Sequence, residues 1–474
     1  MVRPVGKAAR RAKPPNSHPR NLPPPLIQLI ATFLPADSFF NYLRAFQWTH
    51  SLGDLRHFLT LVNEGIVDAS DVWPELHFRW VDAANVNKFH RMAKFVSVVH
   101  AHDGVFDLDW LERILTPAIS LALQAWPSDV DLSIPIQDWG PQLARRMRVS
   151  HLSFADFGLS GGSGGGHMVT LLPQLPHLRS LNVEELDAEF VDDVFDFVCC
   201  SKLTRLTLGS YSVPVVITTE RALALTMWLK REPVQLLELN HCSFEEGAHL
   251  PTIHRLLDAV CRSPMESLVL TNMTFDSELS TWQPIPIASR RVTFESTPMS
   301  DTQAALLFRG LCKGATTHLH VNDMKLTLPG MASLSVAIAD SPLQVVTVEL
   351  TTMDGEGWGC VAKAIARSKH LRELYLLRTG LLDCDVAYIA NALVNASSVR
   401  VVHVVGNAIR FAGAVALVQC LGRRRHALDE LKMEGLAVSE DEAAVLQSMA
   451  DGFPMLKRCV VTTNVAMHVA MQSF

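Results

Sequence analysis

The stretch from Leu371 to Leu421 repeats itself with an offset of 28 residues (399 − 371 = 28). Each copy opens with alternating apolar residues, which is the pattern of a half-buried strand. A short polar turn follows, and then apolar residues four apart predict one face of a helix. One strand and one helix of this length cannot bury a core alone, whereas stacked copies cover one another. The sequence therefore predicts a repeat array.

The copy that starts at Val399 carries nearly every position of a known repeat. Asn407, Ile409, Gly413 and Leu417 stand where LxxLxLxxNxLxxxGxxxLxxxLxxxx requires them. The chain thus resembles the ribonuclease-inhibitor-like leucine-rich repeat proteins. That resemblance implies an α/β solenoid, a horseshoe with a parallel sheet inside and helices outside. The predicted first positions of LxxLxL are Val149, Leu178, Leu203, Val234, Met265, Ser289, Thr316, Leu343, Leu371, Val399, Leu428 and Leu456.

The asparagine position of this repeat departs from the family pattern. Asparagine stands there only at 407, and the other copies hold cysteine, methionine or threonine. A continuous asparagine ladder along the turns is therefore not expected. We assign residues 127–474 to the repeat domain and residues 51–126 to a helical connector with atypical first repeats, as terminal repeats usually are.

Composition excludes several classes of protein. The chain has 474 residues, of which 48% are apolar and 19% charged, so a large buried core is expected. No apolar run reaches the ~20 residues of a membrane-spanning helix, and the start lacks the apolar centre of a secretion signal. The nine cysteines contain no CxxC pair. Reduced thiols in a cytoplasmic or nuclear protein fit this pattern better than disulfides.

Residues 1–21 form a basic tail that we interpret as disordered and solvated. Residues 1–36 hold six basic residues and no acidic one, within a net charge of −6. A nuclear-import signal, a nucleic-acid patch and a mitochondrial presequence are alternatives. We expect no nucleic-acid or membrane partner and no cofactor.

Residues 22–50 predict a small helical module. Apolar residues at helical spacing form one stripe between two prolines, and a second helix capped by Asp37 or Ser38 follows. This module resembles the opening half of the F-box, over roughly 30 residues, on the positions Leu22, Pro23, Leu26, Ile30, Phe33, Leu34, Pro35, Asp37 and Leu43. The resemblance implies docking on a Skp-type adaptor, and through it a cullin complex, by Leu22, Pro23, Leu26, Ile30, Leu34 and Pro35. The alternative is a two-helix cap over the open end of the solenoid.

Candidate chemistry in the sequence is weak. The glycine run Gly158–Gly166 contains two degenerate GxSxG matches, and we interpret it as a flexible loop. His318 and His320 lie two apart on one strand face, but with His403 they do not specify a metal site. Arg423–His426 is interpreted as a solvated edge. We therefore expect no catalytic residue and no metal.

The residues between the core positions of each strand should face the open, concave side of the sheet. These are Arg205, Glu238, Arg291, His318, His320, Glu349, Tyr375, His403, Glu430 and Lys432. The favoured hypothesis is a non-catalytic substrate-recognition subunit of an SCF-type ubiquitin ligase that binds an unknown protein target on this face. A repeat scaffold or inhibitor without a ubiquitin link is the second hypothesis. A GTPase-activating repeat protein resembling the Ran activator is the third, although no residue matches its essential asparagine or arginine.

Overall fold

The computed structural model describes residues 22–463 with gaps at 48–49, 80, 103, 156–163, 186, 276–281 and 284. The basic tail and most of the glycine run lie outside the described residues. The chain divides into two compact units. Unit 1 comprises residues 1–152 and 174–177, and unit 2 comprises residues 153–173 and 178–474. Each unit is described by itself.

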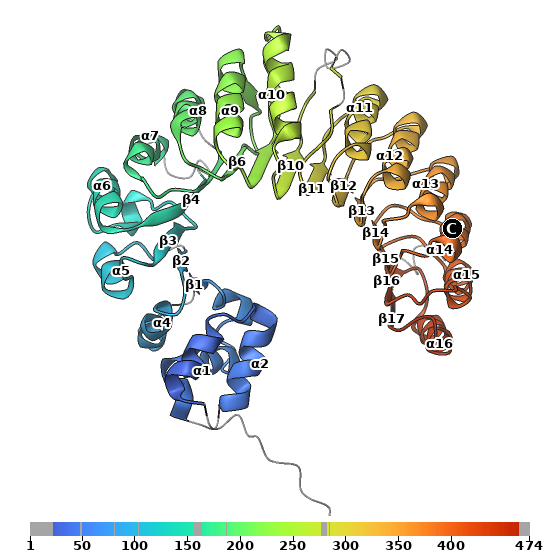
Figure 1. Cartoon of the computed structure of the whole chain (residues 1–474), viewed down its shortest axis with the longest axis horizontal. Helices are drawn as coiled ribbons and strands as arrows, with labels where there is room; N and C mark the ends of the chain where they lie inside the picture. Colours follow the sequence, from blue (N-terminus) through green and yellow to red (C-terminus); the bar gives the residue numbers. More distant parts are fainter. Residues whose placement is uncertain are drawn as a thin grey trace, which may run out of the picture. The chain divides into compact units, whose positions relative to one another are not determined.

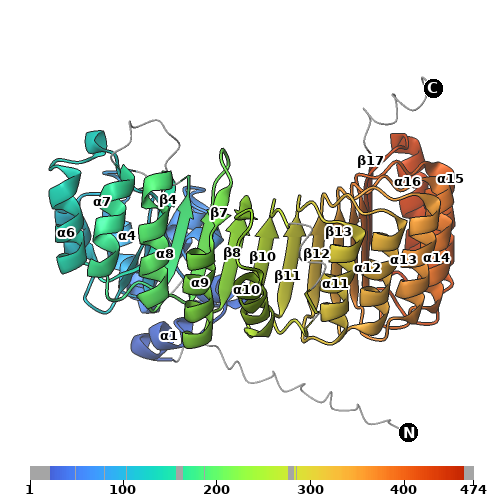
Figure 2. The ribbon, with the colours of Figure 1, turned by 90° about the horizontal axis from the view of Figure 1, so that it is seen from above.

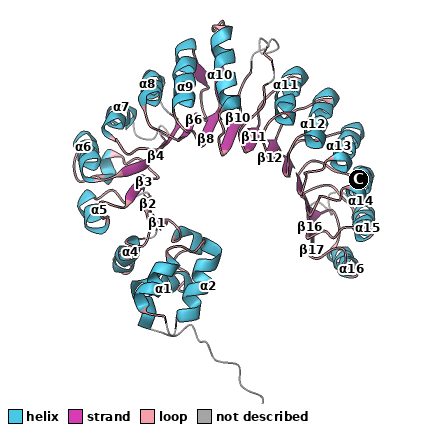
Figure 3. Cartoon of the chain, viewed as in Figure 1, coloured by secondary structure: helices cyan, strands magenta, loops and turns pink. Residues whose placement is uncertain are grey.

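Unit 1 begins with a helical module and continues with short strand–helix repeats (Figures 1 and 3). Its main elements are α1 (Pro24–Ala31), α2 (Ala36–Phe46), α3 (Arg56–Asn63), β1 (Leu76–Phe78), α4 (Val86–Ala93), β2 (Val98–Ala101), α5 (Leu108–Ile114), β3 (Ser120–Leu123), α6 (Ile136–Arg146) and the start of β4 (Val149–Ala155). Strands β1 to β4 pair in chain order, and all pairs are parallel. Strands therefore already occur within the predicted connector 51–126.

The N-terminal helices are held by an aromatic core. Phe39, Leu43 and Phe46 on α2 are buried, as the apolar spacing predicts. The ring of Phe39 stacks on the indole of Trp73 at a centroid distance of 4.0 Å. The prediction that Asp37 or Ser38 caps α2 is wrong. The helix begins at Ala36 after an extended Pro35, whose fixed φ suits a helix start and which makes no side-chain cap bond.

Unit 2 is a regular strand–helix array. Its strands are β5 (Ser180–Glu184), β6 (Arg205–Gly209), β8 (Leu236–Asn240), β10 (Ser267–Thr271), β11 (Arg291–Glu295), β12 (His318–Asn322), β13 (Val345–Glu349), β14 (Glu373–Leu377), β15 (Val401–Val405), β16 (Glu430–Leu436) and β17 (Cys459–Thr463). Its helices are α7 (Gly164–Leu171), α8 (Val191–Cys200), α9 (Thr219–Arg231), α10 (Leu250–Arg262), α11 (Asp301–Cys312), α12 (Leu328–Asp340), α13 (Gly355–Arg367), α14 (Asp383–Asn395), α15 (Phe411–Gly422) and α16 (Glu440–Asp451).

The strands of unit 2 pair in parallel and in chain order, side by side as Figure 2 shows. The helices cover one face of this sheet and leave the inner, concave face open (Figure 1). Two extra strands, β7 (Val215–Ile217) and β9 (Cys242–Phe244), form a separate parallel pair. The predicted fold class, a leucine-rich-repeat solenoid of horseshoe form, is confirmed.

Repeat register follows the sequence pattern closely. From β5 to β16, each strand of the large sheet begins two residues after a predicted first position of LxxLxL. Leu374, Leu376, Val402 and Val404 are each at most 1% exposed, and so is Leu417 on α15. The spacing of only 24 residues between Met265 and Ser289 (289 − 265 = 24) also has a structural cause. Among the described residues between β10 and β11, none forms a helix.

A left-handed residue ends nearly every strand of unit 2. It occupies the eighth repeat position at Glu185, His241, Asn272, Ser296, Asp323, Leu350, Arg378, Gly406 and Gly435, with φ between 44° and 67°. Seven of these nine residues are not glycine, although residues other than glycine rarely adopt a positive φ. The sequence predicts a polar turn after the strand but gives no sign of its left-handed residue, which lets the chain leave the sheet.

The ninth repeat position bridges neighbouring repeats. The Asn407 Oδ1 atom accepts hydrogen bonds from the Thr379 N–H at 2.9 Å and the Leu381 N–H at 3.3 Å. Its amide nitrogen donates to the Leu376 carbonyl at 2.9 Å. Threonine does part of this work elsewhere, since the Thr351 hydroxyl accepts from the Met324 N–H at 3.2 Å. Threonine therefore replaces the asparagine that the sequence lacks.

Candidate protein-interaction surfaces

The concave face of unit 2 is built from residues that alternate with the core. On strands β12 to β15 the exposure alternates regularly, and the outward residues lie in three rows across the sheet. All ten residues predicted for this face are exposed or half-buried. Arg205, Arg291, His318 and Glu430 lie in the first row, Glu238, His320, Tyr375, His403 and Lys432 in the second, and Glu349 in the third.

The register brings some of these residues together. Tyr375 lies directly opposite His403 on the next strand, and their rings meet edge-on with centroids 4.7 Å apart. His320 Nε2 lies 3.4 Å from a Glu349 carboxylate oxygen. Arg205 lies six strands away from Tyr375, or ~30 Å along the sheet at ~4.8 Å per strand. The predicted residues thus form a group on β11 to β16, with Arg205 on β6 and Glu238 on β8 apart from it, and not one compact site.

Sequence reasoning missed several carboxylates on the same face. The outward positions of β5 to β16 hold seven glutamates, namely Glu184, Glu238, Glu295, Glu349, Glu373, Glu430 and Glu434. They hold three permanent cations, Arg205, Arg291 and Lys432. The same alternation that identified the predicted residues points to the missed ones. The face therefore has a net charge of −4 (3 − 7) when its histidines are neutral.

Burial and neighbouring charges tune the groups of this face. Burial raises the pKa of Tyr375 to about 12, and its hydroxyl donates to Glu373 at 2.7 Å. Burial also lowers the pKa of His403, against the attraction of Glu430. For His318, burial and then the charge of Arg291 lower the pKa. Tyr375 is therefore a neutral donor, and these two histidines are neutral near pH 7, each with one N–H donor and one acceptor nitrogen.

A second surface lies on α1 and on the turn that follows it. Ile27 and Ala31, four residues apart, are the buried positions of this helix. The opposite stripe is uncovered, with Leu26 45%, Leu29 53%, Ile30 37% and Phe33 78% exposed. Of the other predicted contact residues, Leu22, Pro23 and Pro35 are exposed and Leu34 is half-buried. The apolar stripe predicted from sequence thus faces away from the core that the helix itself joins.

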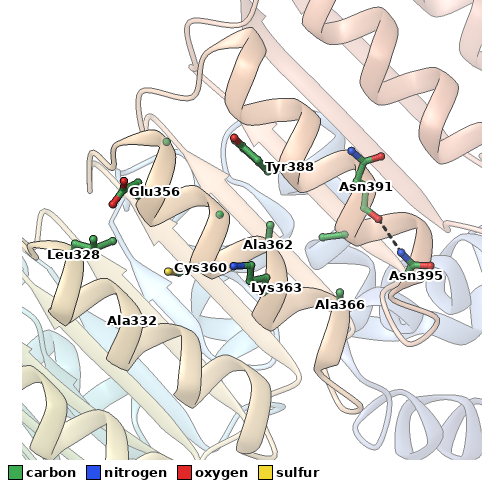
Figure 4. Close-up of a pocket in the computed structure, with 13 residues that line it drawn as sticks. Leu328, Ala332, Glu356, Cys360, Ala362, Lys363, Ala366, Tyr388, Asn391 and Asn395 are labelled. Atoms are coloured by element: carbon green, nitrogen blue, oxygen red, sulfur yellow. Dashed lines mark hydrogen bonds between the residues drawn. The ribbon is translucent and has the colours of Figure 1, made fainter.

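A groove of about 800 Å³ lies on the helical side of unit 2 (Figure 4). Sequence reasoning did not predict it, although the small residues Gly355, Gly359, Ala362 and Ala366 of α13 supply its floor. Leu328 of α12 and Tyr388 of α14 flank these residues. The groove therefore forms because α13 carries small side chains there, whereas the neighbouring helices α12 and α14 carry larger ones.

The arginine run Arg423–Arg425 does not form a uniformly solvated edge. Arg424 is only 4% exposed, which corrects the sequence interpretation for this residue. Its Nη2 atom donates to the carbonyls of Ala396 at 2.7 Å and Val399 at 2.9 Å. Burial, and then the charge of Arg400, lower its pKa to about 10. Arg424 thus ties the end of α15 to the turn of the preceding repeat.

The described residues contain no group of three or more His, Cys, Asp or Glu residues arranged to hold a metal ion. No helix in this part of the chain is long and apolar enough to cross a bilayer. The two GxSxG matches centred on Ser160 and Ser163 lie outside the described residues.

Comparison with known proteins does not assign the chain to a family. No family model and no curated protein matches its sequence. Solved structures with a similar course include an internalin, InlF, from Listeria monocytogenes str. 4b F2365. It is 15% identical, with a TM-score of 0.34 over 72% of this chain and 88% of that chain.

Two further structures are similar at the same low level. TLR13 in its complex with ssRNA13 is 12% identical, with a TM-score of 0.42 over 82% of this chain and 52% of that chain. The plant peptide hormone receptor RGFR1 in complex with RGF2 is 11% identical, with a TM-score of 0.26 over 79% of this chain and 72% of that chain. The fold assignment therefore rests on the repeats of the chain itself.

Proposed function

We propose that this chain is a non-catalytic recognition protein with two binding surfaces, the substrate-recognition subunit of an SCF-type ubiquitin ligase. One observation carries the proposal. The stripe formed by Leu26, Leu29, Ile30 and Phe33 is left uncovered by the described chain, although it is the most apolar face of α1. Exposed apolar patches of this kind mark interaction sites. The F-box resemblance of residues 22–46 supplies the partner, a Skp-type adaptor.

The concave face of unit 2 is the proposed site for the ubiquitylation target. An open sheet face offers a broad contact surface and no enclosed pocket for catalysis. Its Tyr375–His403 pair offers rigid aromatic area, and its excess of carboxylates favours a target surface rich in lysine and arginine. We therefore expect a basic region of the target to contact β12 to β16.

Adaptor binding tests the first surface. Purified chain and the Skp-type adaptor from the same cell are mixed at micromolar concentration, and binding is measured by calorimetry. Leu26→Glu combined with Ile30→Glu should abolish binding while the melting temperature changes little, because both side chains are exposed. Leu223→Glu on α9, an equally exposed leucine, is the matched control and should bind normally.

The cap hypothesis forecasts the opposite outcome of this experiment. If the α1 stripe only shielded the repeats, the double variant would lower the melting temperature markedly and no adaptor binding would exist to be lost. Wild-type chain that does not bind the adaptor at micromolar concentration would sink the ubiquitin-ligase proposal.

Charge reversal tests the second surface. Arg291→Glu with His320→Glu, and separately Glu373→Arg with Glu430→Arg, alter the concave face. Glu356→Arg with Glu440→Arg makes the same change on helices α13 and α16. Partners captured by tagged wild-type chain and quantified by mass spectrometry should be lost from the Glu373→Arg/Glu430→Arg variant, which removes carboxylates from the face, and kept by the helical control. The Arg291→Glu/His320→Glu variant makes the face more acidic and should therefore keep partners that bind through a basic surface. Retention of every partner by both concave variants would contradict this site.

One observation favours a scaffold without a ubiquitin link as the second candidate. The Trp73 indole nitrogen donates to the Leu34 carbonyl at 2.9 Å, and its ring stacks on Phe39. These contacts join the helical module to the segment that leads into β1. A helical module that packs against the first repeats is also what the end of a repeat array requires as a cap. Adaptor binding separates the two candidates.

A further inference from the structure

Four histidines gather on one face of the first strands of unit 1. His77 on β1 pairs in register with His100 on β2, and Ala122 of β3 separates His100 from His151 on β4. His102 follows His100 by two residues and so lies on the same side of the sheet. The rings of His77 and His100 stack at a centroid distance of 4.1 Å with an interplanar angle of 3°. The ring centroids of His77 and His102 are 5.2 Å apart.

Hydrogen bonds within this histidine cluster require particular protonation states. The His77 Nδ1 and His102 Nε2 atoms are 3.0 Å apart, so one nitrogen carries the hydrogen and the other accepts it. The Gln124 amide donates to His100 Nδ1 at 2.8 Å, and His100 Nε2 lies 2.5 Å from a Glu75 carboxylate oxygen. With Nδ1 as acceptor and Nε2–H as donor, the His100 ring is neutral.

The surroundings of His77 oppose its protonation. Burial lowers the pKa of His77 to about 4, and charge on His100 or His102 acts in the same direction. The carboxylates of Asp71 and Glu75 act in the opposite direction but do not overcome this effect. An imidazole in water is half protonated near pH 6.5. His77 therefore remains neutral in the closed structure at a pH where a solvated histidine would be charged.

The segment that carries His77 also carries the anchor of the N-terminal helices. Trp73 is four residues earlier and is 3% exposed, between Phe39 and the Leu34 carbonyl. Glu75, the partner of His100, lies between Trp73 and His77. A displacement of β1 therefore acts on both the histidine cluster and the contact with α2.

We propose that the histidine cluster is a proton-sensitive lock between β1 and β2. While the rings are neutral, the cluster holds β1 in place. When the strand opens, His77 takes up a proton, and this proton keeps β1 and the Trp73 anchor released. The stabilisation is fully present above about pH 6.5 and is lost as the pH falls toward 4, because the open form binds the proton and the closed form does not. The open fraction at pH 5.5 should be about tenfold greater than at pH 7.5.

Hydrogen–deuterium exchange of the full chain, corrected for the intrinsic pH dependence of exchange, measures this opening. Between pH 7.5 and 5.5, amides of β1 and β2 should lose about tenfold protection, and those of α2 should lose protection to a smaller extent. Amides of β10, whose neighbours β8 and β11 carry no histidine within the strands, should not change.

Two variants assign the effect to His77. His77→Phe keeps a stacked ring and His77→Gln keeps a hydrogen-bonding group, and neither titrates, so both should remove the pH dependence at β1 and β2. His90→Gln on α4, an exposed histidine of the same unit, should keep the full tenfold change.

The proposal is overturned if the exchange protection of β1 and β2 in the wild type changes by less than about twofold between pH 7.5 and 5.5. This test needs only the wild-type chain, so it holds even if a variant does not fold. The proposal is also overturned if both His77 variants lose as much exchange protection at β1 and β2 as the wild type does. The same holds if β10 loses as much protection as β1 and β2. None of these outcomes depends on adaptor binding.

Discussion

The short repeats of unit 1 and the regular repeats of unit 2 solve the same packing problem with different side chains. Helices α12, α13 and α14 have 13 residues each, whereas α4 has 8 and α5 has 7. Strands β12 to β15 have five residues with strict alternation of exposure, whereas β1 has three and β2 four. A short repeat has fewer positions with which to fill its interior.

Aromatic side chains compensate for this in unit 1. The Phe78 ring on β1 meets Phe89 of α4 at 5.7 Å and Trp110 of α5 at 5.3 Å. Trp139 on α6 is 2% exposed and meets Phe106 edge-on. In unit 2 the corresponding interior is mostly leucine, valine and isoleucine. Unit 1 thus concentrates its packing in a few large residues, and unit 2 distributes it over many equivalent ones.

The largest effect is expected from Trp139→Ala. The change removes a buried indole and the hydrogen bond from its Nε1 atom to the Phe106 carbonyl at 2.9 Å, at a cost of about 3–5 kcal/mol. Loss of exchange protection should extend over β2 to β4 and spare β13 to β15. Trp110→Ala, at a partly exposed position, should cost less. Equal costs for the two would contradict a concentrated core.

Leu376→Ala is the matching change in unit 2, with an expected cost of about 2–4 kcal/mol. Because each repeat is stabilised by its neighbours, the damage should spread to β13 and β15 and leave residues 22–46 unchanged. Urea unfolding combined with hydrogen exchange measures both the size and the spread. Simultaneous loss of the N-terminal module would argue against independent units.

Asn407→Ala should cost about 2 kcal/mol, because it leaves the buried N–H groups of Thr379 and Leu381 without an acceptor. Asn407→Thr should cost less, since threonine fills the same position at Thr351 and Thr379. Thermal unfolding of the two variants gives the ranking. If Asn407→Thr lost as much thermal stability as Asn407→Ala, threonine would not be able to replace asparagine at the ninth repeat position.

The smallest effect is expected from Arg424→Met, within about 1 kcal/mol of wild type. Two of its guanidinium nitrogens, Nε and Nη1, have no hydrogen-bond partner among the described residues, so a flexible apolar chain of similar length loses little. Both changes leave the carbonyls of Ala396 and Val399 without the Arg424 donor, but Arg424→Ala should be worse because it also leaves a cavity. Urea unfolding of unit 2 compares the pair, and a large loss for methionine would contradict this assignment.

Periodicity predicted the strands, the concave positions and the buried leucines of unit 2. A half-buried strand must alternate and a covering helix must repeat every three to four residues, so both patterns are visible in one copy. The missed glutamates, such as Glu373, obey the same alternation and could have been found. The hydrogen bonds by which threonine replaces asparagine at the ninth position of other repeats could not be predicted from such periodicity.

The sequence by itself determined the repeat period and which face of each strand is open, since both follow from local spacing. Only the tertiary structure decided that Ile27 and Ala31, not the larger stripe of α1, face the core. It likewise buried Arg424 and stacked His77 on His100. These outcomes depend on register and packing between residues that are distant in the sequence, 23 apart for His77 and His100 (100 − 77 = 23) and 28 apart for Arg424 and Ala396 (424 − 396 = 28). Local periodicity carries no record of which distant residue completes a contact.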